Sequence, residues 1–250
     1  ISGKLDFRLP TWNSEEPNYI CGNKIAFAQS DVSRKTWLFI ALIASIGLLG
    51  YFKYANFFIN SYIALANSVG WHVTNFEIQI LVPVGISFFT FQALTYPLDL
   101  YFGRSKNTAS FLIFITYVTF LPKLFAGPIA RANNFMSGLS EKRTFQIENI
   151  EDGCIRFLTG YFKKVIVADN IAIYLVNPVM ISPNSYSSTT LWVAMLGYAV
   201  QIYADFSGYS NMAIGSAKIL GLKIPENFAF PYLATSFSDF WRRWHITMST

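Results

Sequence analysis

The residues best suited to chemistry lie at the end of the chain, in the segment Asp239-Phe-Trp-Arg-Arg-Trp-His-Ile-Thr-Met-Ser-Thr250. An acid, two arginines and a histidine stand there among three large aromatic residues, in a chain that otherwise avoids charge. Ionisable groups next to apolar sequence of membrane type cost free energy, so such a cluster is a functional-site hypothesis by default. We therefore take this segment as the first candidate site.

Within the segment, His245 is the candidate proton acceptor, because a histidine beside an acid or an arginine can act as a general base in a fixed tautomer. Arg242 and Arg243 could bind a phosphate, a carboxylate or a thioester-linked carrier. On a continuous helix, three-to-four residue spacing would place Asp239 and Ile246 on faces next to the arginines. The competing interpretation is a membrane-interface helix whose tryptophans and arginines face the lipid headgroups. On physical grounds the two interpretations stand about even.

Further polar residues lie inside apolar runs. Asp205 is the sole charge between Leu191 and Ala217, and Ser207 belongs to the hydroxyl- and amide-rich sequence around it. Asp205 could line a proton or ion path in a transporter, or it could hydrogen-bond to a neighbouring helix and order a catalytic tunnel. For Gln92 and Thr90, in another apolar run, we prefer interhelical hydrogen bonding.

The composition indicates a polytopic membrane protein. Charged residues make up 13% of the chain, hydrophobic residues 53% and aromatic residues 18%, whereas a soluble domain carries about 25% charged residues. The net charge of +5 suits basic residues at membrane surfaces. Because those residues are scattered in pairs between apolar runs, nucleic-acid binding is disfavoured. Cys21 and Cys154 lie far apart as expected free thiols, and no metal-ligand spacing occurs, so we expect no metal and no bound cofactor.

The predicted fold is an all-α, polytopic integral membrane helical bundle with re-entrant or interfacial helices. About 20 apolar residues cross a bilayer as a helix. The candidate segments are 37–58, 78–102, 107–122, 153–178 and 191–217. Prolines in the second predict a kinked, buried helix, with Asp99 forming an interfacial ion pair with Arg104 or Lys106. Lys163 and Lys164 predict that the fourth is tilted or partly lies on the membrane surface.

Residues 1–33 are polar and are predicted to be an extramembrane loop or linker, followed by a membrane domain over 34–250. The positive-inside bias conflicts with a simple threading of the spans. The basic groups concerned are Arg34, Lys35, Arg104 and Lys106 on one side, and Lys123, Arg131, Lys142 and Arg143 on the other. A re-entrant segment around Gly127 and Pro128 would resolve this conflict.

Four segments together resemble one known family. They are LVPVGISFFTFQALTYPLDLYFG (81–103), FLPKLFAGPIARANNF (120–135), GYFKKVIVADNIA (160–172) and the whole of 201–250. They are similar to the membrane-bound O-acyltransferase family, and most closely to its bacterial branch of alginate O-acetyltransferases and teichoic-acid D-alanyl transfer proteins. The resemblance runs from about Ser33 to Thr250, is most specific in the last fifty residues, and does not include 1–32.

The resemblance implies a multi-pass enzyme of the cell's inner (cytoplasmic) membrane with a central funnel or tunnel. Such an enzyme moves an acyl group, with acetyl preferred here, from a thioester donor such as acetyl-CoA or an acyl carrier. The implied acceptors are hydroxyls of an exported polysaccharide or cell-envelope polymer, reached with partner acyltransferase proteins. No nucleic acid is implied, and the lipid bilayer is the other expected partner.

The resemblance also gives His245 a supporting role, as the first recurring histidine of the family in the motif Trp-Arg-Arg-Trp-His. The principal catalytic histidine is expected in a Leu-Trp-His-Gly-type segment beyond Thr250. Because the chain also starts at Ile1 without an initiator methionine, we expect a fragment that is inactive by itself. The residues expected to bind substrate or line the tunnel are Asp205, Ser207, Asp239, Arg242, Arg243 and Gln92.

Two alternatives stay open. One is a transporter or channel in which Asp205, Gln92 and Asp99 line the path of the solute. The other is a non-catalytic scaffold that passes acyl groups only together with partner proteins.

Overall fold

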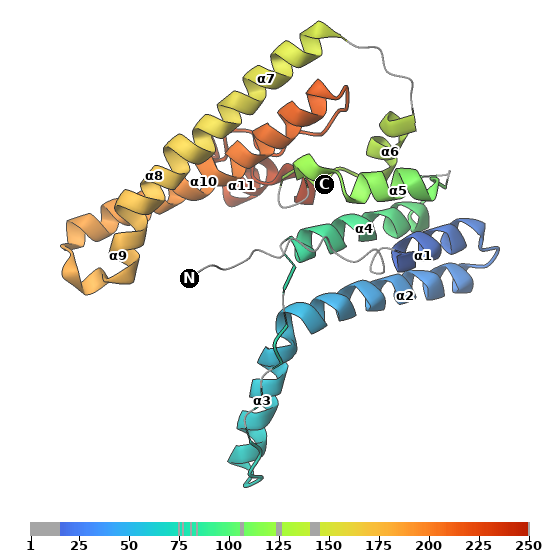
Figure 1. Ribbon diagram of the computed structural model, residues 1–250, viewed down its shortest axis with the longest axis horizontal. Coiled ribbons are helices and arrows are strands. Elements are labelled where there is room, and N and C mark those ends of the chain that lie inside the picture. Colours follow the sequence, from blue (N-terminus) through green and yellow to red (C-terminus); the bar gives the residue numbers. More distant parts are fainter. Residues whose placement is uncertain are drawn as a thin grey trace. The chain divides into compact units, whose positions relative to one another are not determined.

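The computed structural model describes residues 16–74, 76, 78–80, 82–83, 85–105, 108–123, 127–140 and 146–249. Every regular element within this part of the chain is helical. The chain divides into two compact units (Figure 1). The N-terminal unit comprises residues 1–119 and 131–133, and the C-terminal unit comprises residues 120–130 and 134–250.

In the N-terminal unit, helices α1 (Glu16–Phe27), α2 (Asp31–Leu49) and α4 (Ile86–Tyr101) lie side by side (Figure 1). A π-helical turn η2 (Gly50–Tyr54) joins α2 to α3 (Ala55–Ser68), and the chain bends there. The core of this unit contains Cys21, Ala41 and Leu94.

Helix α1 corrects the expectation that residues 1–33 form a polar loop. The polar residues of α1 suggest a solvent-exposed loop, but several of them form hydrogen bonds within the protein. Asn18 is buried and its Nδ2 donates to Ser45 Oγ at 3.0 Å, while Cys21 and Ile25 pack in the interior. The first fifteen residues of the predicted loop lie outside the described residues.

The second predicted span is shorter than expected. Gly85 adopts a left-handed backbone (φ 78°) immediately before α4, which therefore begins only at Ile86 and runs for 16 residues. That length is below the ~20 residues that cross a bilayer. The buried Gln92 donates from Nε2 to the Tyr117 carbonyl at 2.6 Å, and Tyr117 lies in α5 (Phe111–Val118). The preferred interhelical hydrogen bond is thus confirmed for Gln92. It is not found for Thr90, whose buried Oγ1 makes no hydrogen bond to the described residues.

Asp99 forms the expected ion pair with Arg104, with Oδ1 and Nη1 3.8 Å apart. Asp99 is only 3% exposed, whereas the Arg104 side chain is 49% exposed. The pair is therefore half-buried, and its place at a membrane interface stays a prediction. Lys106, the other predicted partner, lies outside the described residues.

The third predicted span also contains only a short helix, since α5 has eight residues. A 3₁₀ turn η3 (Leu121–Lys123) and then α6 (Ala132–Ser140) follow. Lys123 is fully buried, with Nζ 4.0 Å from the centre of the Phe135 ring. Burial holds the pKa of Lys123 well below its usual range. Lys123 therefore does not count among the surface cations of the positive-inside argument, and Lys142 and Arg143 lie outside the described residues.

The C-terminal unit is built on two long antiparallel helical stretches (Figure 1). The second is α10 (Ser188–Ile219), whose first turn is capped by the Ser187 side chain accepting from the Thr190 N–H. The first stretch runs without a break through α7 (Ile147–Tyr161), η4 (Phe162–Ala168), α8 (Asp169–Ile171), η5 (Ala172–Val176) and α9 (Asn177–Ile181). A short 3₁₀ turn η6 (Pro183–Ser185) precedes α10.

Two glycine pairs bring these stretches into backbone contact. A Cβ on Gly208 would lie 2.7 Å from the Gly160 carbonyl oxygen, and one on Gly215 would lie 2.6 Å from the Gly153 carbonyl oxygen. The glycines are seven residues apart on each helix, so both pairs fall on one seam. Small residues that let backbones approach in this way are typical of helix pairs in membranes. We call these four residues the glycine seam.

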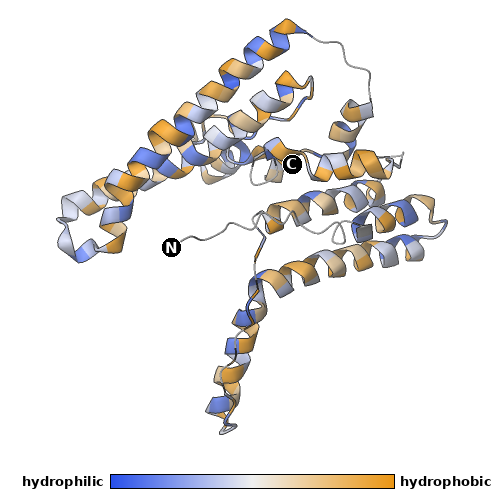
Figure 2. Cartoon of the chain, viewed as in Figure 1, coloured by the Kyte–Doolittle hydropathy of each residue, from blue (hydrophilic) through white to orange (hydrophobic). Residues whose placement is uncertain are grey.

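Two helical stretches are long and apolar enough to cross a membrane, Asp31–Ser68 and Ile147–Ile181, among the described residues. They contain the predicted segments 37–58 and 153–178, and only 17% of each apolar window is buried. Both stretches carry large exposed apolar side chains such as Phe39, Ile43 and Phe162. Figure 2 shows hydrophobic residues recurring along the length of both stretches. Such exposure suits a lipid environment better than the core of a soluble protein. The 32-residue α10, which contains the predicted segment 191–217, is not among these candidates, because polar residues interrupt its apolar sequence.

The seam predicts opposite effects for two glycine-to-alanine substitutions. Gly160→Ala places a methyl group against backbone that cannot move aside, and should lower the free energy of unfolding by about 1–3 kcal/mol. Gly47→Ala, in α2 with open space around its Cβ position, should stabilise by up to about 1 kcal/mol through helix propensity. Thermal unfolding of the detergent-solubilised variants measures both effects. Equal midpoints for Gly160→Ala and the unmodified protein would contradict the seam.

Candidate functional site

The aromatic and charged cluster predicted from the sequence folds as a short helix, α11 (Phe237–Arg243). Ser236 caps it by accepting from the Asp239 N–H, and Asp239 in the first turn suits the positive end of the helix. Arg243 Nε donates to Asp239 Oδ1 at 2.8 Å, the expected i,i+4 pair. This hydrogen bond to Arg243 holds the pKa of Asp239 below its usual value. The pair stabilises the helix that carries the histidine motif.

The helix does not continue through His245, contrary to the expected placement of Ile246 on a neighbouring face. His245 has a left-handed backbone (φ 45°) between α11 and α12 (Ile246–Ser249). Backbone hydrogen bonds from the loop that precedes α11 stabilise the chain before and after this break. Asn227 O accepts from the Ile246 N–H at 3.0 Å, and the Ala229 N–H donates to Arg243 O at 3.0 Å. Backbone hydrogen bonds to the loop thus replace those of a continuous helix.

The Asn227 side chain fixes the tautomer of His245. The Thr247 N–H, which can only donate, points at Asn227 Oδ1 at 3.4 Å. The Thr247 hydroxyl accepts from the Ile129 N–H and donates to the same Oδ1 at 2.8 Å. Because Oδ1 is an acceptor, His245 Nδ1, 3.0 Å away, must carry the proton. The neutral imidazole therefore keeps its lone pair on Nε2, which makes no hydrogen bond to the described residues.

Aromatic rings surround this histidine. The Phe206 ring of α10 meets the imidazole edge to face at 4.8 Å between centres. Trp244 packs perpendicular to Phe228 at 5.1 Å and parallel to Phe240 at 5.6 Å. Trp244 therefore packs within an aromatic cluster, whereas Trp241 is 53% exposed. Burial in these surroundings lowers the pKa of His245 below its ordinary value.

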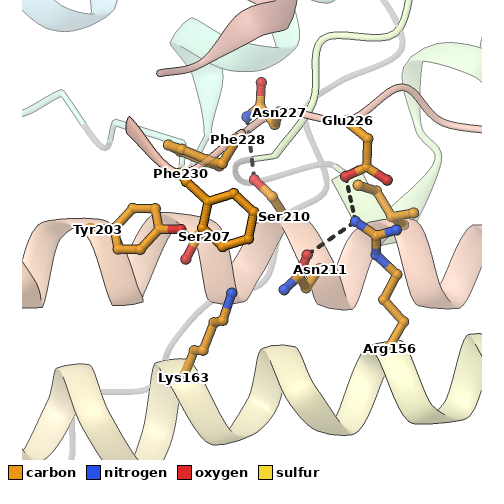
Figure 3. Close-up of a pocket in the computed structure, with 11 residues that line it drawn as sticks. Arg156, Lys163, Tyr203, Ser207, Ser210, Asn211, Glu226, Asn227, Phe228 and Phe230 are labelled. Atoms are coloured by element: carbon orange, nitrogen blue, oxygen red, sulfur yellow. Dashed lines mark hydrogen bonds and ion pairs between the residues drawn. The ribbon is translucent and has the colours of Figure 1, made fainter. Parts of the chain in front are cut away.

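A cavity of about 100 Å³ lies beside the histidine, in the C-terminal unit (Figure 3). Asn227 links the two, because it lines the cavity, binds His245 and donates from Nδ2 to Ser210 Oγ at 3.2 Å. The cavity is lined by Arg156, Lys163, Tyr203, Ser207, Ser210, Asn211, Ile214, Glu226, Asn227, Phe228 and Phe230. Arg156 pairs with Glu226 and donates to Asn211 Oδ1 at 3.3 Å. Whole small-molecule sites are ~300–1,000 Å³, so this cavity suits one group of a larger molecule.

Ser207 lines the cavity, and its side chain has no hydrogen-bond partner among the described residues. It is 3% exposed, and its Oγ makes no hydrogen bond to the described residues. A buried hydroxyl left in this state costs about 1–3 kcal/mol. Ser207, which was predicted as a site residue, thus lies at the cavity wall with a hydroxyl that no described residue binds.

The other predicted site residues lie in different surroundings. Asp205 Oδ1 is 2.5 Å from Lys164 Nζ, which also binds Asp169 at 2.8 Å. This ion pair joins α10 to the neighbouring helical stretch and lies outside the cavity lining. Arg242 is exposed on α11. Gln92 belongs to the N-terminal unit, where it links α4 and α5.

Sequence reasoning missed Asn227, Arg156 and Glu226, and gave Lys163 only a surface role. Asn227 could have been noticed as a polar residue in an apolar loop between two prolines, Pro225 and Pro231. No sequence signal pairs Arg156 with Glu226, because seventy positions separate them.

Comparison with known proteins now adds to this geometry. Residues 103–250 match the membrane-bound O-acyltransferase family, well over half of the chain. The chain belongs to this family. A probable alginate O-acetylase of Pseudomonas aeruginosa is 37% identical over 99% of the chain and 47% of its own length. A peptidoglycan O-acetyltransferase of Helicobacter pylori is 35% identical over 93% of the chain and 48% of its own length.

A third relative represents the teichoic-acid branch. The teichoic acid D-alanyltransferase of Bacillus subtilis is 30% identical over 66% of the chain and 42% of its own length. The predicted family and branch are confirmed. The 99% match corrects the expectation that residues 1–32 fall outside the resemblance, in keeping with the packed helix α1. The chain spans about half the length of the curated relatives it matches.

The lowered pKa of His245 predicts a pH-dependent stability. Below the ordinary histidine pKa of about 6.5 the unfolded chain takes up the proton first, so stability should fall as the pH drops through that value. His245→Gln keeps an amide donor for Asn227 but cannot titrate, and its unfolding midpoint should decline less between pH 7.5 and 5.5. His72→Gln, at an exposed position, is the matched control and should behave like the unmodified protein. The same decline in all three proteins would contradict the prediction.

Proposed function

We propose that the whole protein is a multi-pass O-acyltransferase of the cytoplasmic membrane that acylates hydroxyls of an exported polysaccharide or cell-envelope polymer. The observation that carries this proposal is family membership together with relatives named for O-acetyl and D-alanyl transfer to alginate, peptidoglycan and teichoic acid. The exposed apolar faces of the two candidate spans support the location in a membrane. Acetyl is the proposed acyl group, because the relatives that match most of the chain are named for its transfer.

In this proposal His245 offers the Nε2 lone pair to a hydroxyl of the acceptor or to a group that orients it. The support is the Nδ1–H tautomer fixed by Asn227, and the lowered pKa, which keeps the ring neutral at pH 7. A neutral imidazole with one bare nitrogen can accept a hydrogen bond or a proton, whereas an imidazolium cannot. The principal base of the reaction is proposed to be a second histidine, which the family resemblance leads us to expect beyond Thr250.

The remaining roles follow from the same hypothesis. A thioester, acetyl-CoA or an acyl carrier, is the proposed donor, and the walls of a tunnel would keep water from hydrolysing it. Partner acyltransferase proteins are proposed to complete the transfer to the polymer. Asp239 and Arg243 are proposed to position the histidine motif and not to contact substrate, because their side chains are bound to each other in an ion pair.

The transporter alternative gains no support from the described residues. Asp205 forms an ion pair with Lys164, and the Gln92 amide donates to the Tyr117 and Val118 carbonyls at the end of α5. A path lined by both residues would need both side chains at an open surface, and Gln92 is 1% exposed, whereas the Asp205 side chain is 48% exposed and faces Lys164.

Replacing His245 by alanine in the protein at its full natural length should reduce acyl transfer by about 100-fold or more, the range of general acid–base catalysis. Transfer is measured as labelled acyl groups covalently attached to the isolated polymer, an outcome that solute transport would not produce. His72→Ala is the control and should keep full activity. Undiminished transfer by a folded His245→Ala protein would contradict the proposed role of His245 in the reaction. A wild-type protein that leaves the polymer unlabelled with every thioester donor would sink the proposed function.

A further inference from the structure

The cavity beside His245 carries one more positive charge than its own residues neutralise. Arg156 and Lys163 supply two cations, and Glu226 supplies one carboxylate, which is bound to Arg156. No carboxylate of the described residues lies within salt-bridge distance of Lys163 Nζ. Figure 3 shows this ammonium pointing from η4 toward α10 and the cavity. The charge balance therefore favours a monovalent anion.

Lys163 differs from its neighbour Lys164 in its ion pairing. Lys164, one position along the same π-helical segment, binds two carboxylates, Asp169 and Asp205. Lys163 instead has its Nζ 5.9 Å from the centre of the Tyr203 ring, at the cavity wall. The π-helical turn thus sends two adjacent lysines to different surroundings, one already neutralised and one not.

The cavity also contains hydrogen-bond donors without an acceptor. Ser207 Oγ is buried and unpaired, and the Nε of Arg156 is buried and unpaired as well. Buried polar groups are nearly always satisfied in folded proteins, so both donors call for an acceptor that the described residues do not supply. An oxyanion provides several acceptor oxygens at once and bonds strongly to arginine and lysine.

We propose that Arg156, Lys163 and Ser207 form a subsite for one oxyanion group, a carboxylate or a phosphate, of a larger substrate of the acyl-transfer reaction. The subsite rests on the proposed function for the identity of that substrate, but not for the binding of the anion. The cavity volume of about 100 Å³ admits such a group and excludes a whole sugar or nucleotide. Asn227 lines the cavity and binds His245, so an anchored anion would place its molecule beside the histidine.

The direct test measures anion binding without any acyl transfer. The purified full-length protein in detergent is titrated with sodium acetate or with inorganic phosphate at constant ionic strength, and the thermal unfolding midpoint is recorded. The expected result is a saturable rise that Lys163→Met weakens about tenfold in apparent affinity, the effect of losing one charge-assisted hydrogen bond. The control Lys218→Gln removes a lysine from the same helix pair, where it binds Asp152, and should leave the rise unchanged. No saturable rise, or equal behaviour of both variants, overturns the subsite.

Kinetics then identify the source of the anion. Transfer is measured with a uronate oligosaccharide and its carboxyl-reduced counterpart as acceptors, and with acetyl-CoA and acetyl-pantetheine as donors. If the acceptor supplies the carboxylate, Lys163→Met should raise KM about tenfold for the uronate and not for the reduced oligosaccharide. If the donor supplies a phosphate, KM should rise for acetyl-CoA and not for acetyl-pantetheine. A loss of kcat with every pair and no change in any KM would reject the subsite. Failure of the proposed function appears differently, as an anion titration that succeeds in a protein without transfer activity.

Discussion

The close approach of two backbones at the glycine seam is the constraint on which the rest of the C-terminal unit depends. Gly160 and Gly208 bring the helical stretch of α7 and η4 against α10 with no side chain between them. Arg156 lies one turn before Gly160, Lys163 lies one turn after it, and Ser207 is next to Gly208. The residues of the cavity therefore flank the contact point. A wider separation of the two helices would move the cations away from the hydroxyl.

A second interaction, the Asn227 side chain, connects this helix pair to the histidine motif. Its amide bonds to Ser210 on α10 with one end and to His245 and Thr247 with the other. Asn227 is 1% exposed, so each of these bonds is made in surroundings where an unpaired polar group is costly. The same amide thus decides the tautomer of the histidine and its distance from the cavity, which is why the motif alone does not define the site.

The sequence predicts the class of the fold better than its boundaries. The apolar stretches at 37–58 and 153–178 are inside the candidate spans because length and composition suffice to indicate them. The stretches at 78–102 and 107–122 contain only short helices, since Gly85 and the Pro122 region break the backbone within apolar sequence. Sequence reasoning did not predict helix α1 because its polar residues suggest solvent exposure. In the fold, Asn18 of α1 is instead buried in a hydrogen bond to Ser45 of α2.

For the site, the sequence by itself determined the chemistry available: a histidine, an acid and two arginines in a motif that marks the membrane-bound O-acyltransferase family. Residue types and their order carry that information without any knowledge of distance. Only the tertiary structure decided the use of each group. It pairs Arg243 with Asp239, turns the chain at His245, and sets Arg156, Lys163 and Ser207 around one cavity. These pairings join residues up to seventy positions apart, and only the packing of the helices brings such residues within hydrogen-bonding distance.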